Sequence, residues 1–436
     1  FKVTGPNNYN KEVTVTNGKI TLDKLKKGTY TIKEISAPYG YLLDTKSYNV
    51  EVKVNQTATQ AVVNIEPTGT FTLVKKNEDK SASLKGAEYR IWNDNYDKTF
   101  TTNDNGEIKV EGLKLGKYNY QETKAPEGYL LDDTVYSFEL KYKDQNTAVV
   151  FASAERTDKE PTGSISIIKK DIKTGSTTQG DAVFEGAVYK VYANEDIYNK
   201  AKTKKFYSKG DLVATRTMDE KGTTEDITKL PLGKYLVKEE VAPKGYMLDT
   251  KEYEVNLTYK DQHEEIISNT TTSLEKVKEM GLHIFKSGIK ENSGVTPGLA
   301  GAEFTIKLNA DVEKAYDQGY TYEEVWNGID EDGNLVTVEE KRVAEAQKIA
   351  PTYEIITTDE NGDAYTQNKL PFGKYIVKET KTPADYETSV DFTFSITEDE
   401  SEVVEIAKKT KHIVVNNEQL ETYIKLIKKD LKTNKP

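Results

Sequence analysis

Four copies of one short motif, each separated from the next by the length of a domain, constrain the fold of this chain more than any other feature. Each copy reads Gly-x-Tyr, a few alternating residues, a Glu, and then a turn that contains Pro. The copies lie at residues 28–41, 116–129, 233–246 and 373–386. Their glutamates are 88, 117 and 140 residues apart. Repeats of this length are whole domains rather than solenoid units.

A second motif comes earlier in each module: an alternating run that ends in Lys, then a turn, Gly-Ala and another alternating run. It occurs at residues 71–77, 164–171 and 282–288, and its first part returns at 423–430. Residue 1 matches the run that follows Gly-Ala. The predicted domains are a partial module without its first strand at 1–66, complete modules at 67–160, 161–275 and 276–419, and the first strand of a following module at 420–436.

The segments between the motifs predict an all-β chain. They alternate with period 2, are rich in Val, Ile, Thr and Tyr, and are separated by Gly, Asn and Asp turns. This pattern is typical of immunoglobulin-like antiparallel β-sandwiches. Because residues 66–69 and 160–163 pass directly into the next strand, we expect an elongated rod. Insertions at 194–210 and 309–350 depart from the pattern, and the second contains a predicted short amphipathic helix at 338–350.

Composition excludes several classes of function. The chain has no cysteine, which rules out disulfides, thiolate nucleophiles and zinc–thiolate sites. Its 61 Lys and Arg against 72 Asp and Glu give a net charge of −11, which disfavours nucleic-acid binding. No apolar run is long enough for a membrane span, so we expect no membrane insertion. The acidic turn at 330–334 lacks the Gly and the Glu of a calcium loop, so no metal and no cofactor are expected.

Strand alternation places a charged pair on the inward face of each module. Lys75 shares parity with Phe71 and Leu73, and the motif glutamates share parity with the apolar residues before them. The lysines at this position are Lys75, Lys169 and Lys286, and the glutamates are Glu34, Glu122, Glu239 and Glu379. Buried charges need partners. The alternative is that the lysines are solvated strand ends and that the glutamates protect a sheet edge.

The last strand of each module offers a third partner. An alignment of the modules without gaps places Asn64, Ala152 and Asn269 in one column. The fourth module offers Asn416 or Asn417, and Asn417 is favoured because it precedes Lys428 by 11 residues, as Asn64 precedes Lys75.

A Lys, a Glu and an Asn that are buried together can react with one another. Burial favours the neutral amine and the neutral acid. The amine can then attack the carboxamide while the acid relays the proton to the departing ammonia. Rigid placement supplies the effective concentration that such a weak electrophile needs. The product would be an isopeptide bond between the first and last strands, formed without cysteine.

The combined motifs resemble the B-type repeat domain of Gram-positive collagen adhesins and of SpaA-like backbone pilins. The resemblance rests on the first-strand Lys, L-x-G-A-x-[FY], G-K-Y and [KQ]-E-x-x-A-P-x-G-Y, and it covers nearly the whole chain. It implies a transthyretin-like (prealbumin-like) or reverse immunoglobulin-like sandwich with self-generated isopeptide bonds. Carried over by position, the implied bonds join Lys169 to Asn269 with Glu239 as the catalytic acid, and Lys286 to Asn417 with Glu379.

The remaining modules depart from this pattern. The second has Lys75 and Glu122, but Ala152 occupies the acceptor column, so we expect no bond there. Asp158, which lies 11 residues before Lys169, is the alternative acceptor.

The first module has Glu34 and Asn64 without a lysine, whereas Lys428 has neither a Glu nor an Asn. Either the sequence is cut from a longer tandem array, or the strand of Lys428 completes the first module of an adjacent identical chain by donor-strand addition.

The expected function is structural: a stalk or pilus-shaft segment of an extracellular Gram-positive surface protein. The alternative is an adhesin whose insertion at 309–350 binds a host matrix or glycan ligand. The expected partners are neighbouring modules of the same or an adjacent chain. No turnover enzyme is expected, because isopeptide formation is a single event and no other catalytic grouping is apparent.

Overall fold

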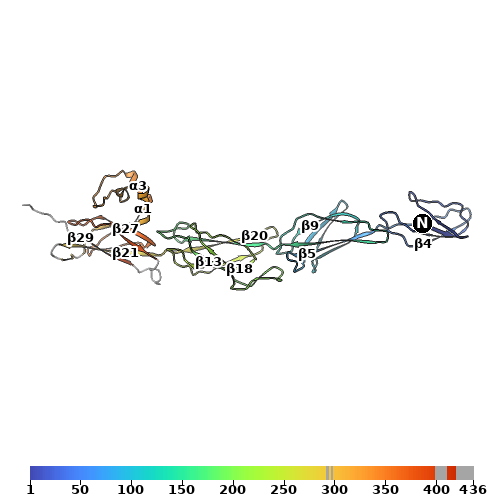
Figure 1. The fold of residues 1–436 in the computed structure, drawn as a ribbon, viewed down its shortest axis with the longest axis horizontal. Helices are drawn as coiled ribbons and strands as arrows, with labels where there is room; N and C mark the ends of the chain where they lie inside the picture. Colours follow the sequence, from blue (N-terminus) through green and yellow to red (C-terminus); the bar gives the residue numbers. More distant parts are fainter. Residues whose placement is uncertain (291–293, 296–297, 398–409, 419–436) are drawn as a thin grey trace, which may run out of the picture.

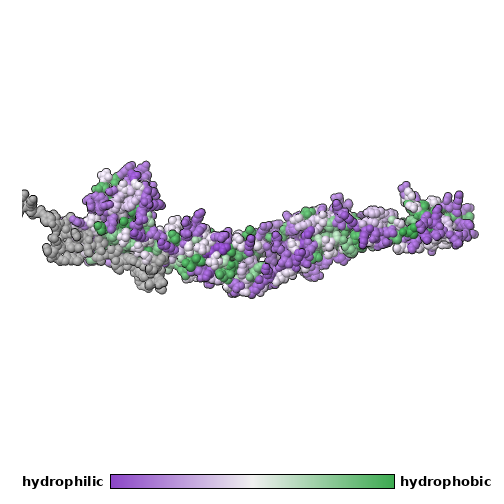
Figure 2. Space-filling view, in the orientation of Figure 1, coloured by the Kyte–Doolittle hydropathy of each residue, from purple (hydrophilic) through white to green (hydrophobic). Residues whose placement is uncertain are grey.

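Four modules follow one another along an extended rod, and the second, third and fourth are β-sandwiches of two sheets (Figure 1). The structure is a computed structural model that describes residues 1–290, 294–295, 298–397 and 410–418. The predicted all-β fold class is confirmed, and the helices among these described residues all lie in one insertion. Figure 2 shows that the visible surface is mostly hydrophilic, with hydrophobic residues scattered along it. Within the described part of the chain, no helix has the length and apolar character needed to cross a membrane.

The first module contributes a single four-stranded sheet in the order β2-β1-β3-β4. Its strands are β1 (Lys2–Gly5), β2 (Tyr9–Glu12), β3 (Gly28–Lys33) and β4 (Ser47–Val52). Residues 56–67, which include Asn64, form no strand.

The second module is a sandwich of two sheets, in the orders β10-β9-β6-β7 and β11-β5-β8. Its strands are β5 (Thr68–Asn77), β6 (Glu88–Asn93), β7 (Tyr96–Thr101), β8 (Glu107–Lys114), β9 (Gly116–Lys124), β10 (Tyr136–Leu140) and β11 (Val149–Asp158). The first and last strands, β5 and β11, are parallel neighbours. Alternate residues of β5 and β9, among them Phe71, Leu73 and Tyr120, fill the core between the sheets.

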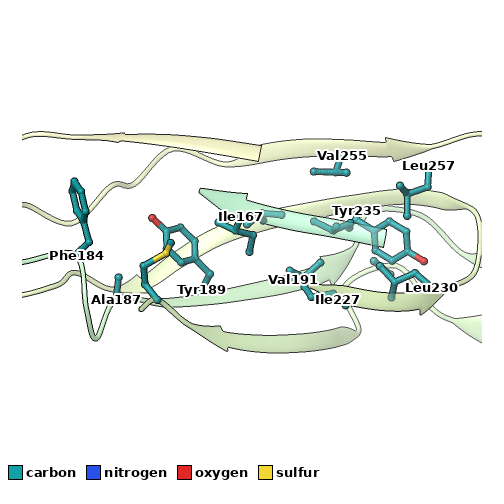
Figure 3. Close-up of a cluster of buried hydrophobic side chains, with 14 of the residues drawn as sticks. Ile167, Phe184, Ala187, Tyr189, Val191, Ile227, Leu230, Tyr235, Val255 and Leu257 are labelled. Atoms are coloured by element: carbon teal, nitrogen blue, oxygen red, sulfur yellow. The ribbon is translucent and has the colours of Figure 1, made fainter. Parts of the chain in front are cut away.

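The third module repeats this plan, with sheets β17-β12-β20 and β16-β13-β18-β19. Its strands are β12 (Thr162–Asp171), β13 (Val188–Ala193), β14 (Ile197–Tyr198), β15 (Lys205–Tyr207), β16 (Leu212–Thr217), β17 (Ile227–Leu230), β18 (Gly233–Val241), β19 (Tyr253–Leu257) and β20 (Ile266–Glu275). Figure 3 shows the buried side chains between the two sheets, including Ile167, Tyr189, Val191 and Tyr235. The insertion at 194–210 forms the hairpin of β14 and β15.

The fourth module again pairs its first strand β21 in parallel with its last strand β29. Its second sheet has the order β24-β23-β27-β28. The strands are β21 (Glu279–Lys290), β22 (Gly294–Val295), β23 (Glu303–Leu308), β24 (Thr352–Thr357), β25 (Asp363–Tyr365), β26 (Leu370–Pro371), β27 (Gly373–Lys381), β28 (Phe392–Ile396) and β29 (Thr410–Glu418).

The insertion of the fourth module forms a helical lobe on the side of the rod (Figure 1). Its helices are α1 (Asn309–Asp317), α2 (Tyr322–Val325) and α3 (Glu340–Ile349), so the predicted helix is confirmed in α3. A small core that includes Val312, Trp326 and Ala346 packs against Ile376 of β27. Lys307 of β23 is buried beneath it and donates to Gln347 Oε1 (2.8 Å), Ala350 O (2.7 Å) and Thr352 Oγ1 (3.1 Å).

Candidate crosslink sites

The second module brings one lysine and two acids together in a site closed to solvent. Lys75 of β5, Glu122 of β9 and Asp158 of β11 all have side chains that are 0% exposed. Lys75 Nζ lies 2.9 Å from Glu122 Oε1 and contacts Asp158 Oδ1. It also donates to the hydroxyl of Tyr89, 2.8 Å away. The three groups that an amide-forming reaction requires are therefore within reach of one another.

A glycine turn fixes the backbone of each buried lysine. The Lys75 N–H donates to Gly106 O (2.8 Å), and the corresponding bonds in the next modules run from Lys169 to Gly222 (2.8 Å) and from Lys286 to Gly362 (2.7 Å). Gly106 has a φ of +70°, and a Cβ there would lie 2.5 Å from Lys75 O. The turn thus requires glycine both for its conformation and for its close approach to the lysine strand.

Burial changes the protonation of the two acids in the second module. It raises the pKa of Glu122 to about 8, against the lowering effect of Lys75 and with a further rise from Asp158. Burial also raises the pKa of Asp158, although the neighbouring Lys75 opposes the shift. One lysine cannot neutralise two buried carboxylates, so one of the acids retains its proton at neutral pH.

The third module has the same arrangement with a second glutamate in place of the aspartate. Lys169 Nζ lies 2.5 Å from Glu239 Oε1 and 2.8 Å from Glu275 Oε1. The Tyr189 hydroxyl, the counterpart of that of Tyr89, accepts from Lys169 at 3.2 Å. Burial raises the pKa of Glu239, with Lys169 acting in the opposite direction. Glu275 therefore occupies the acceptor place predicted for Asn269.

The predicted pairing of Lys169 with Asn269 is wrong. In the parallel pair of β12 and β20, Asn269 is opposite Ile165, whereas Ser273 is opposite Lys169. Four residues of strand separate the two positions by about 13 Å. Asn269 is only half-buried, and its side chain donates to Asn256 O at 3.4 Å.

The error arises because the first module is shorter than the others before its last segment, and the alignment without gaps did not allow for this. Val52 and Asn64 are 12 residues apart, whereas the equivalent Leu140 and Asp158 are 18 residues apart. The true equivalence of Asn64 and Asp158 is visible in the next residue, because Ile65 O accepts from the Leu42 N–H and Lys159 O accepts from the Leu130 N–H, both at 2.8 Å.

The acceptor is defined by register. Asp158 pairs with Asn77 and Glu275 pairs with Asp171, in each case two residues beyond the lysine. Ala152 is opposite Phe71 and does not belong to the acceptor column. The expectation of no bond in the second module rested on Ala152 in the acceptor column, and this premise is wrong, because Asp158, the alternative acceptor, lies at that place.

The fourth module follows the same rule. Lys286 Nζ lies 2.8 Å from Glu379 Oε2, and both side chains are fully buried. Burial lowers the pKa of Lys286, although Glu379 opposes this shift, and so favours a neutral amine. The backbone register of β21 and β29 pairs Gly288 with Asn417 and Ser287 with Asn416. Asn417 therefore holds the position two residues beyond the lysine, and Asn416 does not.

The first module holds the acid and the carboxamide. Glu34 is 2% exposed and accepts from Asn64 Nδ2 at 3.1 and 2.9 Å through its two oxygens. The structure therefore brings together the two residues predicted for this site. Lys428, the lysine considered for it, lies outside the described residues.

Sequence reasoning missed two recurrent parts of these sites. A backbone N–H ten residues after each glutamate donates to its carboxylate, and the donors are Asp44 (2.7 Å), Asp132 (3.0 Å), Asp249 (2.7 Å) and Ser389 (2.8 Å). The aromatic residue of the G-A-x-[FY] motif lies under each lysine, as Tyr89, Tyr189 or Phe304, with the Nζ 5.2 to 5.4 Å from the ring centroid. Both signals are fixed spacings in the sequence.

The described residues contain no cluster of three or more His, Asp or Glu side chains that could hold a metal ion.

The SpaA prealbumin-like fold domain matches the chain four times, at residues 1–66, 69–155, 163–272 and 287–410. The chain belongs to this family. The predicted resemblance to SpaA-like repeat domains is thus confirmed. The chain is built from four SpaA-type modules, and the matched segments contain Glu34 with Asn64, Lys75 with Glu122, Lys169 with Glu239, and Glu379, whereas Asp158, Glu275, Lys286 and Asn417 lie just outside them. No curated protein matches the chain.

The comparison with solved structures finds several pilins and surface proteins, and one of them, the first below, shares the fold at a TM-score above 0.5. The Bacillus anthracis TIE protein is 23% identical with a TM-score of 0.51, and the match covers 95% of this chain and 65% of that one. BcpA, the major pilin subunit of Bacillus cereus, is 16% identical with a TM-score of 0.27, covering 81% of this chain and 99% of BcpA. A streptococcal ancillary pilin is 18% identical with a TM-score of 0.23, covering 81% and 100%. This chain thus spans about two thirds of the TIE protein.

Proposed function

We propose that this chain is a load-bearing segment of a Gram-positive surface stalk or pilus, in which each complete module is sealed by an internal amide bond. The observation that carries the proposal is the fully buried triad of Lys75, Glu122 and Asp158. A buried ion triad is a weak source of stability by itself. The same three positions nevertheless recur in the third module with a different acid, as Lys169, Glu239 and Glu275.

The reaction in the second module is a condensation. In its reactive form the site holds a neutral Lys75 amine and two protonated acids. This form contains the same number of protons as the charged form, which has an ammonium, one carboxylate and one protonated acid. The amine attacks Cγ of Asp158 while Glu122 donates a hydrogen bond to the carbonyl oxygen. A C–N bond forms, the C–OH bond breaks, and Glu122 relays the amine proton to the hydroxyl that leaves as water.

The other modules use the same geometry with other acceptors. In the third, Lys169 attacks Cδ of Glu275 with Glu239 as the acid, and water leaves. In the fourth, Lys286 attacks the Asn417 carboxamide with Glu379 as the acid, and ammonia leaves. The raised pKa of Glu239 and the lowered pKa of Lys286 both favour the uncharged reactants. These are single events in each chain, so we propose no turnover activity.

The position of each bond suits a chain that is pulled from its ends. Force enters the second module through β5 and leaves through β11, which continues almost directly into β12. Lys75 lies near the end of β5, and Asp158 ends β11. An amide between them would therefore carry the pulling force directly from β5 to β11, so that strands β6 to β10 bear none of it. The rod arrangement of the modules supports this role, because force along its axis passes through each module in turn (Figure 1).

Intact mass and peptide mapping of the purified chain test the proposal. We expect the loss of two waters and one ammonia, with linked peptides that contain Lys75 and Asp158, Lys169 and Glu275, and Lys286 and Asn417. A chain with the unmodified mass would disprove the crosslinks and leave only ion triads.

We also propose that a strand like residues 423–430, supplied by an adjacent copy, completes the first module. Glu34 and Asn64 are arranged for a lysine, and the neighbouring Val63 and Ile65 are 76% and 68% exposed, as expected of a segment that has no strand beside it. Lys428 would then seal one chain to the next. Denaturing gels test this, since we expect a ladder of linked chains that Lys428→Ala abolishes. A single monomer band for both chains would contradict it.

A second candidate function is adhesion through the insertion at 309–350. The observation that favours it is that the insertion forms a lobe with its own small core on the side of the rod (Figure 1). The lobe would bind an extracellular matrix or glycan ligand. A binding screen of the whole chain against a variant in which a short turn replaces 309–350 tests this function, and equal binding by both would exclude it.

A further inference from the structure

Two successive joints between modules are built by glutamines at equivalent positions, one in the second module and one in the third. Gln145 of the second module reaches the first, where its Oε1 accepts from the Ala37 N–H (2.8 Å) and its backbone O accepts from the Leu43 N–H (2.8 Å). Gln262 of the third module reaches the second in the same way, through Ala125 (2.9 Å) and Leu131 (3.0 Å). Each glutamine therefore bridges the two ends of the Ala-Pro-x-Gly-Tyr-Leu-Leu turn of the preceding module.

A tyrosine three residues earlier reinforces each bridge. The hydroxyl of Tyr142 donates to Tyr41 O at 3.1 Å, and that of Tyr259 donates to Tyr129 O at 3.3 Å. We call the Tyr and Gln of one module together the clamp of the preceding module. The two joints share this geometry residue for residue, which indicates a built interface rather than a chance contact.

The clamped turn is directly connected to both acids of the crosslink site. Leu131, held by Gln262, is followed by Asp132, whose N–H donates to Glu122 Oε2 at 3.0 Å. Leu130 donates its N–H to Lys159 O at 2.8 Å, one residue beyond the acceptor Asp158. The turn therefore orients the catalytic acid at one point and the acceptor strand at another, and Gln262 holds the turn from outside the module.

Among the described residues, no Tyr and Gln pair of the fourth module contacts the turn of the third in this way. The joint between the third and fourth modules is made instead by Asp181 and Phe372: the Asp181 N–H donates to Phe372 O (2.9 Å), and Phe372 packs into the core of the third module. The segment of the fourth module that follows β28, residues 397–401, contains neither Tyr nor Gln in its sequence.

We propose that Gln262 is a positioning residue for the crosslink of the preceding module, so that the second module reacts fully only when the third has folded against it. The chemical part of this inference rests on the function proposed above. Gln145 holds the turn of the first module in the same way. Crosslinking is thereby coupled to assembly of the rod, and a module that has not docked on its neighbour is sealed slowly.

The test is the rate of each crosslink as the chain refolds. Unreacted chain is collected unfolded from inclusion bodies, refolded, quenched at intervals and mapped for the linked peptides. Loss of one hydrogen-bonding side chain typically costs about 1 kcal/mol, so we expect Gln262→Ala to slow the Lys75 to Asp158 bond by about fivefold or more. The Lys169 to Glu275 bond should form at the wild-type rate, although Gln262 lies in that module.

Two matched variants make the result specific. Gln145→Ala removes the equivalent side chain at the other joint and should leave the Lys75 to Asp158 rate unchanged. Gln262→Glu keeps an oxygen acceptor and should restore most of the rate. An unchanged second-module rate in Gln262→Ala, or an equal slowing of the second and third modules, would overturn the proposal.

Amide hydrogen exchange separates this inference from the proposed function. Exchange at Ala125, Leu131 and Asp132 reports on the turn whether or not any amide bond forms, and Gln262→Ala should accelerate it. If the wild-type chain contains no linked peptides but Gln262→Ala still accelerates exchange at the turn, the crosslink is refuted and the positioning role of Gln262 is retained. Equal exchange in both chains would refute the positioning role.

Discussion

Asp158 pairs two residues beyond Lys75 in a parallel strand pair, and its carboxylate contacts the lysine in a site that Glu122 closes from the other sheet. The same offset relates Glu275 to Lys169 and, in the backbone register, Asn417 to Lys286. A two-residue offset between parallel strands therefore defines the position of the proposed acceptor in each complete module, whether Asp, Glu or Asn occupies it.

Replacement of the catalytic acid should prevent the bond in one module only. Glu122→Gln removes the acid that the mechanism needs while preserving its size, so we expect the second module to keep its water and the other bonds to form normally. A crosslink that closes a loop of roughly 80 residues stabilises by about 4.5 kcal/mol on chain-entropy grounds, and its loss should lower the unfolding midpoint of that module. Intact mass and calorimetry measure the two effects. Retention of the Lys75 to Asp158 peptide in the variant would contradict the role given to Glu122.

The acceptor of the third module can be identified by its leaving group. Glu275→Gln should still react, now losing ammonia instead of water, so the crosslinked variant and the crosslinked wild type should have the same intact mass. Their unreacted forms differ in mass, which makes the coincidence diagnostic. Asn269→Ala is the matched control and should leave the bond unaffected. A mass difference between the two reacted chains would exclude Glu275 as the acceptor.

Sequence parity was sufficient to place the buried lysines and glutamates on the inward face, because the direction of a strand side chain follows from its alternation. Lys75 and Glu122 lie on the inward face as predicted, and both are fully buried. Parity depends only on local structure, and the Gly and Pro turns mark where each strand begins.

The acceptor could not be placed in this way, because register between distant strands depends on loop lengths. Six residues missing from the first module moved the predicted column from Asp158 and Glu275 to Ala152 and Asn269. The 11-residue spacing before the next lysine, which selected Asn417, also selects Glu275 before Lys286. The clamps were not predicted either: the segment Tyr-Lys-Asp-Gln recurs at 142–145 and 259–262, but its repetition does not indicate which turn of the preceding module it contacts.

Crosslink formation in the second module should depend on pH through Glu122. Burial raises the pKa of this acid to about 8 from the ordinary value of 4.5, so it is protonated in the folded module at neutral pH. The rate should therefore fall as pH rises through about 8, because the acid that relays the proton is lost.

The stability of the unreacted folded module should also fall as pH rises, because protonation of Glu122 is linked to folding. A raised carboxyl pKa contributes stability that is complete below about 4.5 and is lost as pH rises toward 8. Refolding from urea at a series of pH values, with peptide mapping for the linked Lys75, measures the rate. A rate that increases steadily from pH 6 to 9 would indicate that deprotonation of the amine, not the acid, controls the reaction.

The helical insertion should depend on Lys307 without any effect on the crosslinks. Lys307 is fully buried, its pKa is lowered by burial to about 8, and it donates to three acceptors beneath α3. Lys307→Met would leave the buried Ala350 carbonyl and the Gln347 side chain without this donor, at a cost of about 2 kcal/mol. We expect faster proteolysis within residues 309–350 and unchanged linked peptides. Lys341→Met, at an exposed position of α3, is the control and should resist proteolysis like the wild type. Equal protease sensitivity of all three chains would show that Lys307 does not hold the insertion on the sheet.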